Sequence, residues 1–326
     1  MEIYFAPMEG MTPSLLRNMH SSYFGGCDKY FTPFISTNEN YLLNHKEQRD
    51  VAPENNSGVC LVPQIISNSA HQSAEYLYLM YEKYGYREVN INMGCPSGCV
   101  VSKGKGSGML RDPGKLEDFF VELEKEIRAV RPEGTFLPDV SIKTRIGFSS
   151  EDEYRKIMEI FLAHPVRQII IHPRSRTQMY QGQVHLKEFG EMYEAFTNAG
   201  IGVVYNGDIR TLEDYEKIAE AFPKLDGVMI GRGLLRNPSL ARYIKGGKQA
   251  DNEEYLTYME AILDGYCERI PSEKNVLAKV KDLISFAKDA FSGYDKGFRD
   301  MCKADSVESF RVCMRQYIRN SELNGL

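Results

Sequence analysis

The sequence of 326 residues lacks long apolar runs and lacks an excess of positive charge. Nowhere does it reach the roughly 18 consecutive apolar residues of a membrane helix, so we expect no membrane anchor. Residues 1–7 hold neither a basic segment nor a long apolar one, so we expect no secretory signal and a cytoplasmic location. The 40 Lys+Arg against 45 Asp+Glu argue against a protein that coats nucleic acid, although a local basic patch remains compatible with this balance.

Cysteine is also scarce. The seven cysteines are odd in number and scattered, which suits a reducing compartment better than a disulfide framework. Cys95 and Cys99 form the one close pair, and no second pair or histidine set with zinc spacing accompanies them, so we expect no metal site. With 42% apolar and 26% charged residues, the composition is that of an ordinary globular protein.

Eight short runs rich in β-branched and aromatic residues recur within the first 235 residues and alternate with helix-length segments. Residues 169–171 and 228–230 are apolar without alternation, as expected of strands covered on both faces. Thr211 with Asp214 resembles a capping box. Eight repeats, and no G-x-G-x-x-G after the first strand, favour a (β/α)8 TIM barrel over an open doubly wound α/β sheet. The expected strands are 3–8, 30–35, 60–66, 88–93, 140–146, 168–172, 202–206 and 227–231.

The pattern becomes purely helical after residue 245. Residues 245–249 are a turn-rich linker. We therefore expect two domains, a barrel over 1–245 and a small all-helical domain over 250–326; the alternative is that the last helices wrap around the barrel. The expected helices are 253–269, 273–291, 296–303 and 306–318.

Polar residues stand at the ends of seven of the eight expected strands, where barrel enzymes place their catalytic groups. Lys143 lies inside a strand and is expected to meet an anion or an electron-rich ligand atom, unless it is a solvated strand end. Gly207, Gly231 and Gly233 with Arg232 predict a phosphate site after the last two strands, the alternative being tight turns. The strand-end groups are Glu9, Gln64, Asn92, Cys95, Lys143, Arg145, His172, Arg174, Asn206, Asp208 and Arg232.

Cys95 directly follows the fourth expected strand. It can act as a nucleophile with His172 as base, or as a general acid, because a thiol with a pKa of about 8.5 is mostly protonated near neutral pH. A packed small residue is the plain alternative. The glycine-rich loop 104–108 follows with Lys103 and Lys105; it lacks P-loop spacing and is either a mobile basic flap or a flexible loop.

Taken together, these motifs resemble the tRNA-dihydrouridine synthases. The block from Asn92 to Pro96, with the glycine loop up to Leu110, is the most specific element. The family usually has His-Gly-Arg where this chain has Pro173 between a histidine and an arginine; proline removes a backbone donor, so we expect altered local contacts rather than lost activity. The matching segments cover about residues 1 to 240 and are 6–12, 64, 90–96, 143–145, 172–176, 206–208 and 231–233.

The resemblance implies a flavoenzyme that reduces the C5–C6 double bond of a tRNA uridine, with FMN bound and NADPH or NADH as reductant. Separately, we expect a monomer. Hydride would pass from flavin N5 to C6 and a proton from Cys95 to C5, after the uridine leaves its stack. The barrel would be catalytic and the helical domain would bind tRNA. For FMN the resemblance implies Pro7, Met8, Glu9, Gln64, Lys143, His172, Asn206, Gly207, Asp208, Gly231 and Arg232; for the base and the tRNA we expect Asn92, Lys103, Lys105, Arg145, Arg174, Arg176, Arg311 and Arg315.

The RNA-binding signal of the tail is local. Residues 251–326 hold 11 basic and 14 acidic residues, but residues 296–319 hold six basic and three acidic ones. Arg311, Arg315 and Arg319 recur every four residues and predict one basic stripe for tRNA phosphates, the alternative being a solvated helix face.

An FMN barrel acting on a free pyrimidine, such as a dihydroorotate-type dehydrogenase, needs neither tail nor stripe. A non-catalytic RNA-binding barrel would need neither Cys95 nor Lys143.

Overall fold

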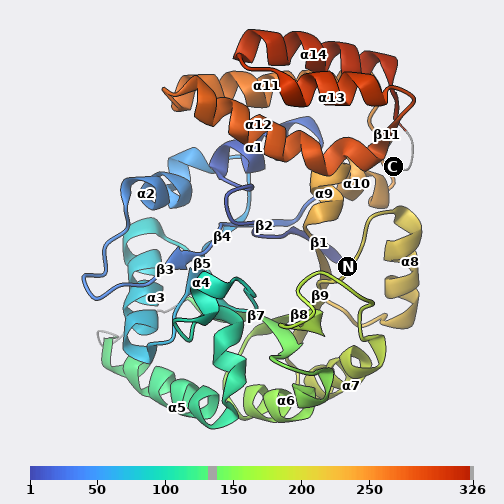
Figure 1. Cartoon of the computed structure of the whole chain (residues 1–326). Helices are drawn as coiled ribbons and strands as arrows, with labels where there is room; N and C mark the ends of the chain where they lie inside the picture. The colour runs from blue at the N-terminus through green and yellow to red at the C-terminus, as the bar shows by residue number, and fades with distance from the viewer. Residues whose placement is uncertain (131–137, 324–326) are drawn as a thin grey trace.

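The computed structural model describes residues 1–130 and 138–323. Ten parallel strands form one sheet in the order β3-β5-β6-β7-β8-β9-β10-β1-β2-β4. The sheet closes into a barrel because β3 continues β2 along the chain and β5 continues β4, so that the pairs β2–β4 and β3–β5 at the two ends of that order belong to the same two positions (Figure 1). The strands are β1 (Glu2–Phe5), β2 (Lys29–Phe31), β3 (Ile35–Ser36), β4 (Leu61–Val62), β5 (Gln64–Ile66), β6 (Glu88–Met93), β7 (Asp139–Gly147), β8 (Gln168–Ser175), β9 (Gly202–Tyr205) and β10 (Gly227–Ile230).

The eight expected strands become ten because proline interrupts two of them. Pro33 separates β2 from β3, and Pro63 separates β4 from β5. Proline has no N–H to donate, so the ladder breaks at that residue while the chain continues in the same direction. Each pair of short strands is therefore one position of the barrel, and the predicted (β/α)8 TIM barrel is confirmed.

Helices cover the outside of the barrel. Ser69 caps the start of α3 and Gly85, with φ of 75°, ends it. The capping box predicted for Thr211 and Asp214 is present at the start of α8. The helices are α1 (Ser14–Tyr23), α2 (His45–Val51), α3 (Ala70–Tyr84), α4 (Gly98–Val101), α5 (Pro113–Val130), α6 (Tyr154–Ala163), α7 (Leu186–Asn198), α8 (Leu212–Ala221), α9 (Arg232–Arg236) and α10 (Leu240–Ile244), with 3-10 turns η1 (Pro53–Asn55), η2 (Gly106–Arg111) and η3 (Glu151–Glu153).

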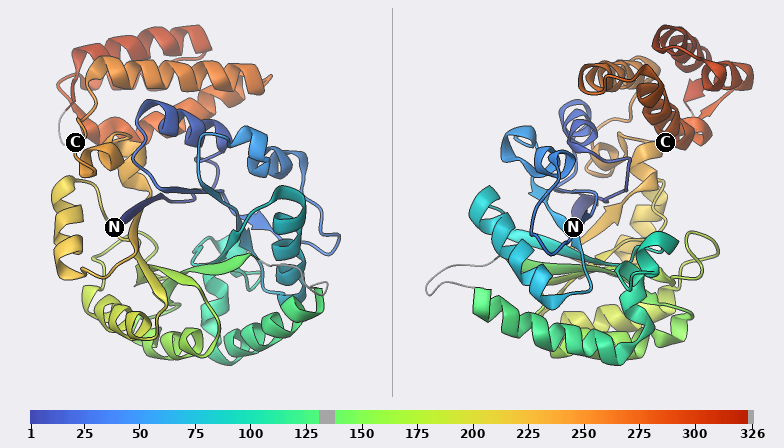
Figure 2. Two further views of the ribbon diagram at one scale, coloured as in Figure 1. Left: turned by 180° about the vertical axis from the view of Figure 1, so that it is seen from behind. Right: turned by 60° about the vertical axis from the view of Figure 1, so that its left-hand side comes forward.

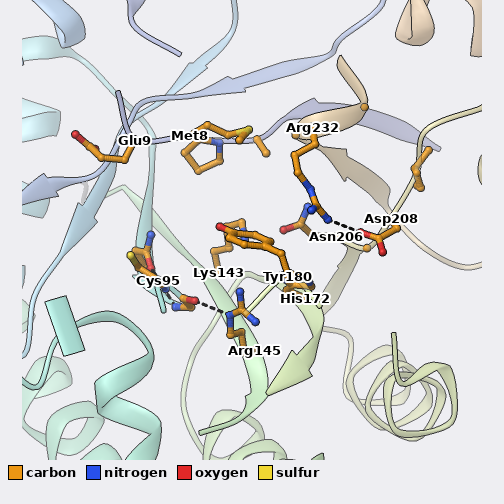
Figure 3. Close-up of a pocket in the computed structure, with 18 of the residues that line it drawn as sticks. Met8, Glu9, Cys95, Lys143, Arg145, His172, Tyr180, Asn206, Asp208 and Arg232 are labelled. Atoms are coloured by element: carbon orange, nitrogen blue, oxygen red, sulfur yellow. Dashed lines mark hydrogen bonds and ion pairs between the residues drawn. The ribbon is translucent and has the colours of Figure 1, made fainter. Parts of the chain in front are cut away.

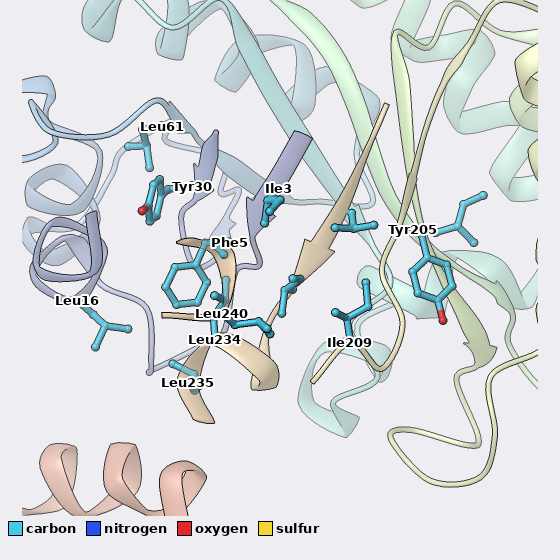
Figure 4. Packing of buried hydrophobic residues seen from close by; sticks show 14 of the residues in the cluster. Ile3, Phe5, Leu16, Tyr30, Leu61, Tyr205, Ile209, Leu234, Leu235 and Leu240 are labelled. Carbon is cyan, nitrogen blue, oxygen red and sulfur yellow. The ribbon is translucent and has the colours of Figure 1, made fainter. Parts of the chain in front are cut away.

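Side chains of successive strand residues enter two different cores. Ile3 and Phe5 point outward and pack under the helices (Figure 4). Tyr4 and Ala6 belong to a separate cluster, as expected of alternating positions on a barrel strand. That second cluster fills the barrel and consists of Tyr4, Ala6, Phe31, Val62, Ile170, Val204 and Met229.

The last helices lie together on one side of the barrel, next to α1, rather than around it (Figures 1 and 2). Tyr258 joins the two parts, because its ring packs against those of Tyr23 and Phe24 at centroid distances of 5.9 and 5.0 Å. Among the described residues, no helix has the length and apolarity needed to cross a bilayer. The tail consists of α11 (Asn252–Arg269), α12 (Glu273–Ala287), η4 (Lys288–Ala290), β11 (Phe291–Ser292), α13 (Asp295–Lys303), α14 (Val307–Asn320) and β12 (Glu322–Leu323).

One detail of the tail differs from the sequence analysis, which expected a helix to residue 291 and no strand. The helix α12 ends at Ala287, and Phe291 and Ser292 form β11, which pairs antiparallel with β12. Phe291 is buried against Tyr255 and Tyr317. Burial of this aromatic side chain against two other helices outweighs the local helical pattern.

Candidate active site

A cavity opens at the C-terminal ends of the barrel strands (Figure 3). Its walls include residues that lie on or just after β1, β5, β6, β7, β8, β9 and β10, the seven strands whose polar residues were singled out from the sequence. Among the described residues, no cluster of three or more His, Cys, Asp or Glu is arranged to hold a metal ion. Of the residues predicted for the site, the cavity is lined by Pro7, Met8, Glu9, Gln64, Asn92, Cys95, Lys143, Arg145, His172, Asn206, Gly207, Asp208, Gly231 and Arg232.

A chain of amide groups runs through the barrel below the cavity. Gln64 donates from Nε2 to Asn90 Oδ1 at 2.7 Å and accepts at Oε1 from Asn92 Nδ2 at 2.8 Å. Asn90 in turn donates to Ser141 Oγ at 3.0 Å. These side chains are all buried, and buried polar groups that satisfy one another hold a single geometry. The orientation of the Gln64 amide toward the cavity is therefore fixed before any ligand binds.

Asn92 also builds the turn that carries Cys95. Its Oδ1 accepts from the backbone N–H of Gly94 at 3.0 Å and of Cys95 at 2.9 Å. On the other side, the carbonyl oxygen of Cys95 accepts from Ser107 N at 3.1 Å and from Ser107 Oγ at 2.8 Å. The thiol thus sits on a backbone that is held from both ends.

The glycine-rich loop is neither a flap nor a flexible loop. Gly106 and Ser107 are buried in η2, and a Cβ on Gly106 would lie 2.9 Å from Val100 Cγ1 and 3.0 Å from the carbonyl oxygen of Cys95. Lys105 reaches back to β3, with Nζ donating to Ser36 Oγ at 3.1 Å and to Thr37 O at 3.0 Å. The glycines serve close packing behind Cys95, so both expectations for this segment are corrected.

The protonation states of three groups in the cavity follow from burial. Burial raises the pKa of the half-buried Cys95 thiol above its ordinary value, so the thiol is protonated at neutral pH. Burial, together with the charge of Arg145, lowers the pKa of Lys143 to about 7. Burial first, and then the neighbouring cations, hold the pKa of His172 well below its usual range. The site therefore combines a neutral thiol, a neutral imidazole and a lysine poised between its two states.

Lys143 and His172 differ in their partners. Among the described residues, Lys143 Nζ has no hydrogen bond or ion pair, although it lines the cavity. His172 Nε2 lies 3.2 Å from Arg174 Nη1, and because a guanidinium cannot accept, the proton of the neutral ring is on Nδ1. No hydrogen bond joins His172 to Cys95 in the described part of the chain, which favours the acid role of Cys95 over a nucleophile activated by His172.

Arg174 is not at the surface, and its predicted contact with tRNA is corrected. It is 1% exposed and donates to Asp208 Oδ2 at 2.5 Å and to the carbonyl oxygen of Gly182 at 2.6 Å. Arg232 binds the other carboxylate oxygen of Asp208 at 2.7 Å. Burial raises the pKa of Asp208, but the two arginines outweigh it and the net pKa is lowered, so Asp208 stays ionised. Arg174 thus ties the loop after β8 to the loop after β9.

Pro173 lies where the ladder between β7 and β8 is irregular. The register is continuous up to Arg145 opposite His172 and shifts before Gly147 opposite Ser175. The missing N–H of Pro173 falls in this irregular stretch, while its carbonyl oxygen still accepts from His185 at 2.9 Å. The altered local contacts expected at this proline, relative to the glycine usual in the family, stay a prediction.

Arg145 is buried and fastens two parts of the rim. Its Nε donates to the carbonyl oxygen of Gly94 at 2.9 Å and its Nη1 to that of Ser175, also at 2.9 Å. Burial lowers its pKa to about 10, so it remains charged at neutral pH. It thereby adds a positive charge to the cavity and also supports the Cys95 turn.

Tyr180 is a cavity residue that the sequence analysis missed. It is 51% exposed, on the loop after β8, and its ring lies over the cavity 4.9 Å from the Arg232 guanidinium and 5.5 Å from that of Arg145. Figure 3 shows the ring among Lys143, His172 and Arg232. Its neighbour Met179 has φ of 52°, a conformation rarely adopted outside glycine. The sequence signal that could have indicated this residue is its position shortly after Arg174, at the end of β8.

The glycines predicted to cradle a phosphate have a packing role as well. A Cβ on Gly207 would lie 1.9 Å from the Tyr205 hydroxyl, and one on Gly233 would lie 2.2 Å from the Ile209 carbonyl oxygen. Close packing alone therefore favours glycine at these two positions. A Cβ on Gly231 would lie 3.2 Å from Met8 Sδ and 3.3 Å from Ala6 Cβ, so this glycine packs closely against the residues just after β1.

The remaining predicted residues lie outside the cavity. Lys103 is exposed, and Arg176 lies over the ring of Phe148 at 5.6 Å. Arg311, Arg315 and Arg319 do share one face of α14, but they are not a free basic stripe. They pair with carboxylates of α11 in an antiparallel ladder of Arg311 with Asp264, Arg315 with Glu260 and Arg319 with Glu253.

The fold and the cavity define a class: a TIM barrel with a cationic pocket at the rim where barrel enzymes bind their ligands. The model of the family described as "Dihydrouridine synthase (Dus)" matches residues 4–306. The chain therefore belongs to the dihydrouridine synthase family.

Named proteins show the same similarity. The chain is 26% identical over 266 residues to a tRNA-dihydrouridine(16) synthase of Aquipseudomonas alcaligenes, covering 80% of each. It is 29% identical over 299 residues to a probable tRNA-dihydrouridine synthase 2 of Bacillus subtilis, covering 90% of this chain and 85% of that protein. Among solved structures, morphinone reductase aligns with a TM-score of 0.55 at 9% identity over 77% of this chain and 87% of that one, a likeness of fold alone.

Proposed function

We propose that this protein is an FMN-dependent reductase of uridine in tRNA that forms dihydrouridine and takes its electrons from NADPH or NADH. The observation that carries the proposal is the held, protonated Cys95 thiol on the same cavity as the unpaired Lys143 amine, in a chain of the dihydrouridine synthase family. The tRNA substrate is supported by the names of the related proteins. Residues 1–245 would carry the catalysis, and the tail from residue 250 would help to bind tRNA.

The donor set of the cavity fits FMN. A flavin needs a hydrogen-bonding or cationic partner along its polar edge and a positive site for its phosphate. Gln64 and Lys143 supply the first, and Arg232, which follows Gly231 in the cavity wall, supplies the second. Pro7 and Met8 form an apolar wall between these two sites. When bound, the flavin supplies the hydride chemistry.

Cys95 would provide the proton for C5 of the uridine. Burial keeps the thiol protonated at neutral pH, and a proton donor must carry its proton when the substrate arrives. Asn92 and Ser107 hold the Cys95 backbone, so the thiol approaches the base in one orientation. Asn92 and Arg145, which support this turn and line the cavity, are proposed to contact the base as well.

A groove between the barrel and the tail supports tRNA binding better than α14 does. Its charged residues are Lys46, Arg49, Arg269, Lys279 and Asp50, which is paired with Arg17, and Tyr266 and Ile270 also line it. Lys46, Arg49 and Arg269 are exposed and form no ion pair among the described residues, so their charges are available to phosphates.

The groove leads to the active-site cavity. A third cavity, beside Glu9 and Phe34, shares these two residues with the active site, and shares Pro33, Lys46 and Asp50 with the groove. A tRNA with its backbone in the groove would thus have a continuous path for one flipped uridine to reach Cys95.

The test is anaerobic. The flavin of the purified, yellow protein is reduced, unmodified tRNA is added, and the return of the oxidised flavin absorbance is followed. We expect rapid reoxidation by tRNA and none by free pyrimidines. Reoxidation by a small pyrimidine alone would instead indicate a barrel oxidoreductase of free bases, and a protein that takes up no FMN would contradict the proposal entirely.

A further inference from the structure

A second cationic cavity adjoins the active site. It lies between the loop after β9, the helix α9 and the tail, and it shares Arg210 and Arg232 with the active-site cavity. Its remaining residues are Thr211, Asp214, Arg236, Ser285, Phe286 and Asp289. Nothing in the proposed chemistry of the uridine uses this space, although it shares Arg210 and Arg232 with the site where that chemistry takes place.

Two arginines of this cavity, Arg210 and Arg236, form no ion pair with a carboxylate in the described part of the chain. Arg210 is exposed and Arg236 is partly buried. Arg236 Nη2 donates only to the backbone carbonyl oxygen of Asp289, at 3.2 Å. Arg232, in contrast, is already bound to Asp208. The guanidinium groups of Arg210 and Arg236 therefore keep donors free for a ligand.

The cavity also contains two acidic residues, and one of them is already used in a helix cap. The Asp214 carboxylate caps α8, where it accepts from the backbone N–H groups of Arg210 at 2.9 Å and Thr211 at 3.1 Å. Asp289 is exposed on the tail side. Because Asp214 closes the start of α8, an anion in this cavity has to be bound by arginine side chains and not by helix amides.

We propose that this cavity is the subsite for the adenosine 2′-phosphate of NADPH, with Arg236 and Arg210 as its ligands. An arginine near the adenosine ribose is how dinucleotide sites commonly accept a 2′-phosphate, and guanidinium groups bind phosphates with paired donors. Phe286 offers an apolar wall for the adenine ring. The inference rests on the proposed function, because it supposes that a nicotinamide reaches the flavin in the adjoining cavity.

Binding of adenosine 2′,5′-bisphosphate and of 5′-AMP to the FMN-loaded protein, measured by calorimetry, tests the subsite without turnover. We expect the bisphosphate to bind more tightly than 5′-AMP, and Arg236→Ala or Arg210→Ala to weaken the bisphosphate about tenfold, the size of one charge-assisted hydrogen bond, without affecting 5′-AMP. Arg87→Ala is the matched control, because Arg87 is an exposed arginine just before β6, at the opposite end of the barrel. Equal binding of the two nucleotides by the unaltered protein would overturn the proposal.

Reduction of the flavin provides a second readout. The concentration of NADPH needed for half-maximal reduction should rise about tenfold in Arg236→Ala, while that of NADH and the FMN content stay unchanged. If the variants instead slow reoxidation by tRNA and leave NADPH unaffected, the cavity binds a tRNA phosphate and the proposal is wrong. If neither NADPH nor NADH reduces the flavin of the unaltered protein, the proposed function itself is contradicted. Equal reduction by both nucleotides is a different result, and it would contradict only the proposed subsite.

Discussion

The active-site cavity and the outer face of the tail are both rich in cations, but they use them differently. Lys143 in the cavity has no partner among the described residues, and its pKa falls to about 7. On α14 each arginine of the predicted stripe has its own carboxylate on α11. A cation left without a partner is costly to bury, so the fold retains it only where something else benefits. The pairing of a charge, rather than its presence, separates the two regions.

The same contrast holds between α14 and the groove. Lys46, Arg49 and Arg269 are exposed, as Arg315 and Arg319 are, but they face no carboxylate within ion-pair distance in the described residues. The charges counted along the sequence favoured α14 as the tRNA-binding surface, whereas the ion-pair partners in the structure favour the groove. Variants in the cavity, the groove and α14 can therefore test whether partner-free cations mark function.

The largest effect is expected for Cys95→Ala. Loss of a positioned general acid typically slows a reaction by about 10²- to 10⁴-fold, and we expect a loss of this order in flavin reoxidation by tRNA, with FMN still bound. Cys99→Ala is the matched control, because Cys99 is an exposed thiol in the short helix α4 just after Cys95. Full activity of Cys95→Ala would refute the acid role.

A large effect on pH dependence is expected for Lys143→Met. In the FMN-free protein the folded pKa of Lys143, about 7, lies below the unfolded value of about 10.4, so the unfolded chain binds more protons between these values. This group therefore makes the free energy of unfolding rise with pH in that window, by up to about 1.4 kcal/mol per pH unit, and contributes no slope below it.

The comparison of Lys143→Met with the parent protein isolates this contribution. Denaturant unfolding between roughly pH 6 and pH 10, a range that covers most of the interval between the two pKa values, should show a flatter profile for the variant. Lys125→Met is the control, since Lys125 is exposed on α5. Parallel profiles for the parent and Lys143→Met would mean that Lys143 is charged throughout and that burial does not perturb it.

A smaller effect, on binding rather than chemistry, is expected in the groove. Replacing Lys46 and Arg49 by alanine should weaken tRNA binding and reduce the slope of log affinity against log salt by about one for each phosphate that the variant no longer binds. The rate of flavin reduction by NADPH should not change. A slope equal to that of the parent protein would place the tRNA backbone elsewhere.

The sequence predicted the barrel and the strand-end residues because both are local in origin. Each of Gln64, Lys143 and His172 lies within or at the end of an apolar strand, and parallel strands bring their ends to one rim. What it did not predict depends on distant partners. Arg174 is buried because Asp208, 34 residues later, closes over it, and Tyr180 lies on a loop without periodicity.

The α14 arginines illustrate the same limit. A four-residue period shows that they share a face, and this prediction is correct. It does not show what faces them, and the carboxylates of α11 come from positions 47 to 66 residues earlier in the chain. The prediction for the glycine-rich loop was wrong for a related reason, because Gly106 packs against Cys95 and Val100.

The smallest effect is expected for Arg315→Gln. Exposed ion pairs contribute little to stability because water and salt screen them, so the variant should unfold only slightly more easily, and less so at high salt. If Arg315 does nothing other than pair with Glu260, the variant Glu260→Gln should lose the same small amount of stability as Arg315→Gln. The affinity for tRNA should then be unchanged in both variants. Arg311→Gln, whose partner is Asp264, repeats the test one turn earlier. A loss of tRNA affinity in Arg315→Gln with none in Glu260→Gln would show that the arginine exchanges its carboxylate for a phosphate, and that a paired cation on this surface can still serve the RNA.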